Sequence, residues 1–186
     1  MTKLPIITVL ILSFVWILSA PLIADEDKAA TLDAEVDAAI AHLTADNEAA
    51  VSLMQDAKGI LVFPDVVKAG LVVGAQYGEG ALRINGETQD YYKTIAGSYG
   101  LQAGAQKFGY AMVFMTEESM GYLENADGWE VGVGPSIVVV DAGIAKSLTT
   151  ATASEDVYVF FFDQKGLMAG AGIQGSKISK MNLEEE

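Results

Sequence analysis

The chain of 186 residues contains no cysteine and only one histidine, His42. Without cysteine there can be no disulfide bond, no cysteine nucleophile and no lipid attached to an amino-terminal cysteine, so the core must hold without cross-links. A lone imidazole cannot assemble a structural zinc site, and it is the only imidazole that could serve as the base for a serine nucleophile. We therefore expect no enzyme activity, no metal site and no cofactor.

Basic residues are also scarce. The chain has 11 Lys and Arg residues against 25 Asp and Glu residues, which gives a formal net charge of −14. A protein this acidic repels phosphate backbones at long range. We therefore expect no nucleic-acid partner.

The amino terminus has the layout of a secretory signal peptide. Lys3 precedes an apolar run from Leu4 to Leu18, and small residues lead to an acidic segment that starts at Asp25. We predict cleavage after Ala24, which leaves a single domain at residues 25–186 and an exported protein of the periplasm or cell envelope. The alternative is an uncleaved anchor helix, for which the apolar run is short.

The remaining sequence predicts an α+β fold. Apolar residues recur at helical spacing over residues 28–57, and a turn signal at residues 44–47 divides them into two helices. After Gly59 come short β-like runs separated by turns, with the strongest hairpin signal at Asn85-Gly86 and a short helix capped by Thr116. We expect N-terminal helices over about 28–58, followed over about 59–182 by a glycine-rich, mainly antiparallel sheet or a barrel-like β domain.

One six-residue pattern occurs three times: GLVVGA at 70–75, GLQAGA at 100–105 and GLMAGA at 166–171, with a looser GWEVGV at 128–133. In a strand this pattern places glycines on one face and apolar side chains on the other. Glycine weakens a strand unless the sheet bends sharply or another backbone packs close. The repeats therefore predict a tightly coiled barrel or a glycine face covered by helices; a ligand groove lined by glycine is the alternative.

Two further patterns carry less information. GAGIQG at 170–175 has the spacing of a dinucleotide-binding loop, but only eleven residues follow it, too few for the helix and second strand that this site needs. The runs IVVVDAG from Ile137 and VYVFFF from Val157 are apolar on both faces. Central strands under helices and a wall facing an apolar ligand or lipid both fit that pattern.

The ordered series of motifs resembles the SYLF-domain family over about residues 30–182. The motifs are AKGILVFPDVVKAGLVVGAQYGEGALRI from Ala57, KTIAGSYGLQAGAQ from Lys93, GVGPSIVVVDAG from Gly132 and VYVFFFDQKGLMAGAGIQGSKI from Val157. The resemblance implies a non-catalytic module that binds phospholipid, also described as an actin-binding domain in fungal proteins. The basic residues at motif positions, and hence the candidate lipid headgroup contacts, are Lys58, Lys68, Arg83 and Lys93.

Two functions stay open at this point. The first is a phospholipid-binding, membrane-associated module of the cell envelope. The second is a protein-interaction or structural domain that uses the same fold without lipid. Lipid binding requires an apolar surface beside Lys or Arg, whereas a protein-binding surface need not combine those two features.

Signal-peptide cleavage gives the first testable prediction. The intact mass of the protein recovered from the envelope fraction should correspond to a chain that begins at Asp25 or within a few residues of it. A mass that retains Met1 would show instead that the N-terminal segment is kept as an anchor.

Overall fold

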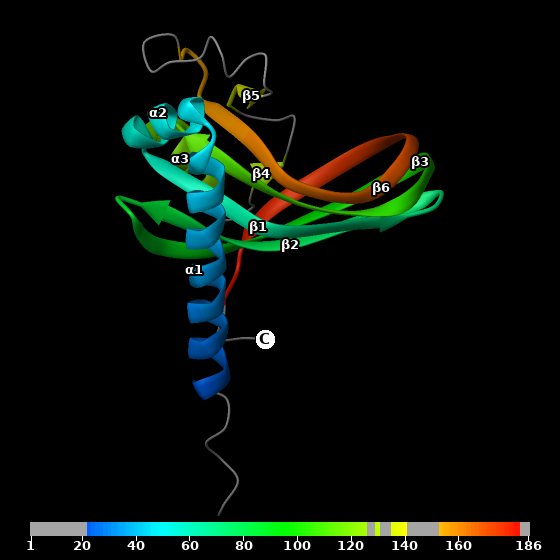
Figure 1. Ribbon diagram of the computed structural model, residues 1–186, viewed down its shortest axis with the longest axis horizontal. Coiled ribbons are helices and arrows are strands. Elements are labelled where there is room, and N and C mark those ends of the chain that lie inside the picture. The colour runs from blue at the N-terminus through cyan, green and yellow to red at the C-terminus, as the bar shows by residue number, and fades with distance from the viewer. Residues whose placement is uncertain (1–21, 126–128, 131–134, 141–152, 183–186) are drawn as a thin grey trace, which may run out of the picture.

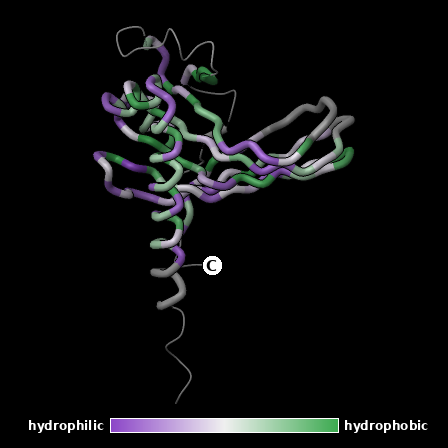
Figure 2. Tube along the Cα trace, viewed as in Figure 1, coloured by the Kyte–Doolittle hydropathy of each residue, from purple (hydrophilic) through white to green (hydrophobic). Residues whose placement is uncertain are grey.

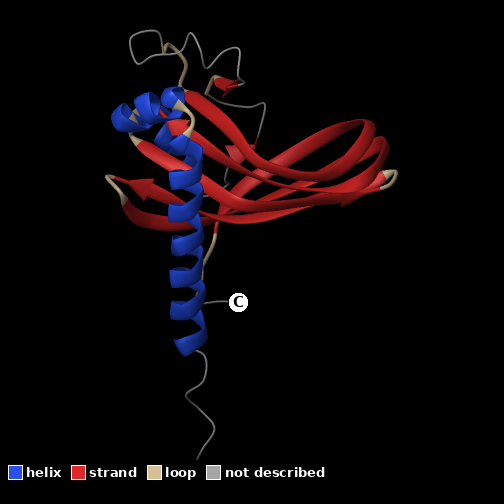
Figure 3. Ribbon diagram, viewed as in Figure 1, coloured by secondary structure: helices blue, strands red, loops and turns tan. Residues whose placement is uncertain are grey.

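The computed structural model describes residues 22–125, 129–130, 135–140 and 153–182. Its helices lie beside one end of a curled sheet (Figures 1 and 3), and most strand pairs in the sheet are antiparallel. This confirms the predicted α+β class and the order of helices before strands; the sheet is a half-barrel. The elements are α1 (Leu22–Ala45), α2 (Glu48–Asp56), β1 (Gly59–Gly70), β2 (Val73–Ile84), β3 (Glu87–Phe114), α3 (Glu117–Glu124), β4 (Trp129–Glu130), β5 (Ile137–Val140) and β6 (Val157–Lys180).

The predicted starts of α2 and α3 are confirmed by their caps, whereas α1 begins at Leu22, earlier than the predicted start at about residue 28. The Asn47 side chain accepts a hydrogen bond from the Ala50 backbone N–H at 3.0 Å and caps α2, which begins three residues after α1 ends. Thr116 caps α3 in the same way through the backbone N–H of Ser119 at 3.2 Å. Polar side chains thus satisfy backbone donors at both helix starts.

The strands form a set of nested bends. β1 and β2 make an inner hairpin that turns between Gly70 and Val73. The first half of β3 pairs with β2 up to Tyr99, and its second half pairs with β1 from Gly104 onward, so β3 bends around the tip of that hairpin. β6 pairs with β3 along nearly its whole length and bends around it in turn. Figure 1 shows the bends stacked at the end of the sheet away from α1 and α2.

The three glycine repeats form these three bends. The repeat at 70–75 spans the β1–β2 turn, and the repeat at 100–105 spans the bend of β3. The repeat at 166–171 leads into the bend of β6, which lies opposite residues 100–103 of β3. Gly104 and Gly166 have φ angles of 144° and 91°, which non-glycine residues rarely adopt. The repeats therefore mark sharp bends of the sheet, as the coiled-sheet prediction required. The looser pattern at 128–133 falls mostly outside the described residues.

The sheet has two faces with different coverings. On the outer face, α1 and α2 pack on the half of the strands nearest to them, through Leu32, Val36, Leu53 and residues such as Val62 and Phe160. The inner face is filled by a second cluster of aromatic and aliphatic side chains and is covered by α3 through Met120 and Leu123. Helices therefore cover the large side chains of the core rather than the glycines.

Two other predictions can be compared with the structure. The β2–β3 hairpin turns at Asn85-Gly86 as predicted, with φ angles of 54° and 85°. Val157, Tyr158, Val159 and Phe160 are all buried, which confirms a core strand for the first part of β6. Of the predicted signal peptide, residues 1–21 lie outside the described residues and residues 22–24 begin α1. No described helix combines the length and the apolar character needed to cross a bilayer.

The bend of β6 generates the second prediction. A Cβ at Gly166 would collide with the carbonyl oxygen of Ala105, and its φ of 91° would strain any other residue. Gly166→Ala should therefore lower the free energy of unfolding by more than about 1 kcal/mol, measured by thermal or urea denaturation.

Gly97→Ala is the matched control, because a Cβ there meets nothing within 4 Å. It should leave stability unchanged or slightly higher, since alanine restricts the unfolded chain more than glycine does. Equal losses for the two variants would show that the close approach at the bend does not matter.

Candidate functional site

Half of the outer sheet face is left uncovered by the helices. Its strand residues beyond α1 are small or apolar and are exposed to solvent. We call this surface the distal face; it consists of Val67, Ala69, Leu71, Val73, Ala75, Tyr77, Ile95, Gly97, Tyr99, Ala103, Ala105 and Leu167. Figure 2 shows apolar residues at the inner bend, beyond hydrophilic residues on the strands nearer α1.

The distal face is continuous because its residues are paired across strands. Val67 lies opposite Tyr77, and Tyr77 lies opposite Ile95, so three large side chains form one row over β1, β2 and β3. The next row holds Ala69 and Ala75. Directly paired residues share a face of a sheet, so this is one surface rather than scattered exposed side chains.

Lysines surround this surface. The chain has no charged residue at 69–78, 94–106 or 166–176, and each uncharged stretch is bounded by lysine on at least one side. The bounding residues, which we call the collar, are Lys68, Glu79, Lys93, Lys107, Lys165 and Lys177. Five of the 11 Lys and Arg residues of this acidic chain therefore border the bends.

Four lysines of the collar lie on the same outer face as the apolar rows: Lys93, Lys107, Lys165 and Lys177. Lys107 pairs with Val67 on one side and with Lys165 on the other, and Lys177 pairs with Ile95. Lys107 also forms an ion pair with Asp65 at 2.8 Å, and the hydrogen bond to that carboxylate raises the pKa of Lys107. The lysine therefore stays protonated at neutral and moderately alkaline pH.

The four basic residues predicted from the sequence do not form one patch. Lys93 lies on the outer face in the collar, one row from Tyr77. Lys68 also belongs to the collar but is paired with Gln76, whose side chain is buried on the inner face. Lys58 precedes β1 at the opposite end of the sheet and lies 3.9 Å from Glu117. Lys93 is thus the one of the four that adjoins the distal face.

Arg83 is buried beneath α1 and holds that helix against the sheet. Its side chain is only 9% exposed and lies under α1, where Nη2 contacts Asp37 Oδ1 at 2.7 Å and the Asp33 carbonyl oxygen at 3.1 Å. Thr88 and Tyr91 donate hydrogen bonds to the Asp33 carboxylate at 2.7 and 3.0 Å. Burial and then this hydrogen bond raise the pKa of Tyr91, which keeps its hydroxyl a donor. These contacts fasten α1 to β2 and β3.

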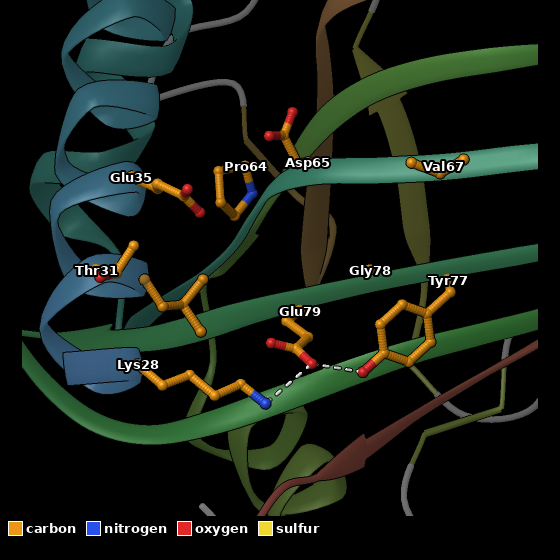
Figure 4. A pocket seen from close by; sticks show the side chains of 10 residues that line it. Lys28, Thr31, Glu35, Pro64, Asp65, Val67, Tyr77, Gly78 and Glu79 are labelled. Carbon is orange, nitrogen blue, oxygen red and sulfur yellow. Dashed lines mark hydrogen bonds and ion pairs between the residues drawn. The ribbon is translucent and has the colours of Figure 1, made fainter. Parts of the chain in front are cut away.

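A groove of about 490 Å³ lies where the distal face meets α1 (Figure 4). Leu32 and Pro64 line it together with Val67 and Tyr77 of the distal face. Lys28 Nζ lies 3.3 Å from Glu79 Oε1, which also accepts a hydrogen bond from the Tyr77 hydroxyl at 2.5 Å. The groove extends the apolar surface to the edge of the helix.

Lys107, Lys165 and Lys177 were missed by the sequence prediction, although Lys165 and Lys177 lie within the motif that starts at Val157. The signal that could have found them is the length of the uncharged stretches and the lysines that bound them. That these lysines face the same way follows from the strand register, which the sequence did not reveal.

Comparison with known families gives the identity of this region. Residues 95–186, about half of the chain, match the family described as Ysc84: Las17-binding protein actin regulator. Residues 95–186 therefore belong to the SYLF-domain family. This confirms the family expected from the sequence, although the match does not reach the motif at residues 57–84. No curated protein matches the chain. Within the SYLF match lie the bends of β3 and β6 and three of the outer-face collar lysines, Lys107, Lys165 and Lys177.

The different environments of Arg83 and the collar lysines generate the third prediction. Arg83→Met keeps the bulk of the side chain but removes the charge that holds Asp33 and Asp37. Because Asp33 is partly buried, the loss of its partner should lower the free energy of unfolding by about 2 kcal/mol.

Lys165→Met is the control, since Lys165 is exposed on β6. Its thermal midpoint should equal that of the unchanged protein, because exposed charges contribute little to stability. If Arg83→Met were equally harmless, the contacts that fasten α1 to the sheet would be unimportant.

Proposed function

We propose that the protein is a non-catalytic module that binds phospholipid membrane surfaces through the distal face and the outer lysines of the collar. The observation that carries this proposal is the position of the collar, which borders an exposed apolar sheet surface on several strands. Apolar side chains that enter the boundary between headgroups and acyl chains, with lysines beside anionic headgroups, are the two contributions that hold peripheral proteins on membranes.

The concentration of lysine supports a lipid partner over a protein partner. The chain carries a net charge of −14, yet five of its 11 basic residues border the bends. Cores of protein–protein interfaces are depleted of lysine, whereas anionic lipid surfaces attract it. A protein-interaction domain is the second candidate, favoured by the family description of an actin regulator and by the same exposed apolar surface.

We also propose that the protein acts in the cell envelope, on the strength of the predicted signal peptide at residues 1–24. The proposal of a non-catalytic role draws support from His42. This histidine is exposed, and its Nδ1 lies 3.2 Å from Oδ2 of Asp163. Among the described residues, no hydrogen bond joins it to a serine hydroxyl. No group of three or more described His, Cys, Asp or Glu side chains is placed to hold a metal ion.

Vesicle flotation tests the lipid proposal. The protein should float with vesicles of equal parts phosphatidylcholine and phosphatidylglycerol. Replacing Lys165 and Lys177 together by Gln should weaken binding by about 2 kcal/mol, roughly thirtyfold, because each lysine near an anionic surface contributes about 1 kcal/mol.

The double variant Lys58→Gln, Lys180→Gln is the matched control. It changes the net charge by the same amount, but Lys58 and Lys180 lie outside the collar in ion pairs with Glu117 and Asp90. It should float like the unchanged protein. If both double variants lose binding equally, net charge rather than the collar controls binding; if the unchanged protein floats with no vesicle, the lipid proposal fails and the protein-interaction candidate replaces it.

A further inference from the structure

The bends form an uncharged tip at the end of the sheet away from α1 and α2 (Figure 1). We define the tip by its five large exposed residues: Leu71, Val72, Val73, Tyr99 and Leu167. Leu71 and Leu167 occupy the second position of two of the glycine repeats. Leu71 lies in the hairpin turn, whereas Leu167 pairs with Ala105 in the row just before the bend of β6. In both repeats the glycines let the chain turn while the leucine is exposed.

Four of the five tip side chains, all except Val72, are more exposed than the apolar side chains in the row beside the collar lysines. Leu167 is 87% exposed and Leu71 is 72% exposed, whereas Val67 and Tyr77, in the row beside the collar lysines, are 53% and 45% exposed. Exposing such large side chains to water at a hairpin turn is unfavourable, and polar or glycine residues are usual there. The tip thus carries apolar surface that the fold itself does not need.

The length of the tip fits one leaflet of a bilayer. Four residues separate the collar row at Val67 from Leu71, a length of about 13 Å in a strand. Half of the hydrocarbon core of a bilayer is about 15 Å thick. The tip can therefore enter one leaflet while the lysines of the collar row stay among the headgroups.

The edge of the sheet limits how deep the tip can go. Among the described strands, β5 and β4 pair with β6 only at residues 157–160 and 177–178, so the outer edge of β6 between them has no strand partner. Unpaired backbone groups are not tolerated in the hydrocarbon interior. The stable depth is thus the boundary between headgroups and acyl chains, about 5–10 Å below the surface.

The geometry points to insertion of the tip into the upper part of one leaflet of an anionic membrane, with the outer lysines of the collar at the level of the phosphates. This inference rests on the proposed function and adds the orientation of the bound protein. Leu71 and Val72 at the hairpin turn enter deepest, together with Tyr99, which pairs with Val73. Leu167 lies two residues from Lys165, in the row of Ala105, and therefore sits nearer the headgroups. The helices, with their acidic surface, face away from the membrane.

The absence of cysteine makes this orientation directly testable, because a single introduced cysteine is the only labelling site. Val72→Cys and Val139→Cys are a matched pair: both replace a valine that is 52% exposed, one at the tip and one on β5. Each full-length variant is labelled with an environment-sensitive fluorophore and mixed with vesicles of equal parts phosphatidylcholine and phosphatidylglycerol.

On vesicle addition, the label at Val72 should shift to shorter wavelength and brighten several-fold, while the label at Val139 stays unchanged. Lipids with a spin label near the headgroup should quench the Val72 signal more than lipids labelled near the chain end. Flotation of the protein with no change at Val72 would overturn the tip inference but leave lipid binding intact. Absence of flotation would overturn both.

Two further measurements complete the test. Val72→Asp should reduce flotation at least tenfold, and Val139→Asp should not, with circular dichroism showing that both variants are folded. If the Val72 label shifts on raising the protein concentration without vesicles, and light scattering shows a dimer, the tip binds a second copy of the chain and insertion is overturned.

Discussion

The fold depends on how closely three strands can turn around one another. At the tip of the inner hairpin, a Cβ at Gly70 would lie against the backbone of Gly74 and 2.8 Å from the carbonyl oxygen of Val73. Gly70 also pairs with Gly104 of the next bend. Side chains at these inner positions would hold the strands apart, so the glycines permit the sheet to curl. The curled sheet then has a filled inner face and an outer face that carries large side chains.

The position of α1 decides how much of the outer face is left bare. The ion pairs of Arg83 with Asp33 and Asp37 fix the helix over the ends of β2 and β3 nearest the Asn85-Gly86 turn. Leu32, Val36, Ala39 and Leu43 then cover the core from that side. Removing one partner of a buried ion pair leaves an uncompensated charge, so the pair holds the helix at this position. The same contacts that anchor the helix therefore leave the distal face uncovered.

The sequence predicted the helix caps and the hairpin turn well, because each depends on residues that are close together in the chain. Asn47, Thr116 and the Asn85-Gly86 pair each act within a few residues, and each was placed correctly. The nested bends could not be predicted in the same way, because the pairing of Gly70 with Gly104 is a matter of register between distant segments. The candidate site shows the same limit: Arg83 was chosen for its charge, but its burial depends on Asp33 and Asp37 in a helix about fifty residues away in the sequence.

Net charge and local charge act over different distances in this molecule. The Debye length at physiological salt is about 8 Å, so the acidic surface of α1 and α2 repels an anionic bilayer only weakly once it lies farther away than that. A membrane that meets the tip would be within reach of Lys165 and Lys177, while the helices cover the opposite half of the sheet. Acidic side chains on the helices and lysines around the tip are therefore compatible with one function, since the fold separates them by the length of its strands.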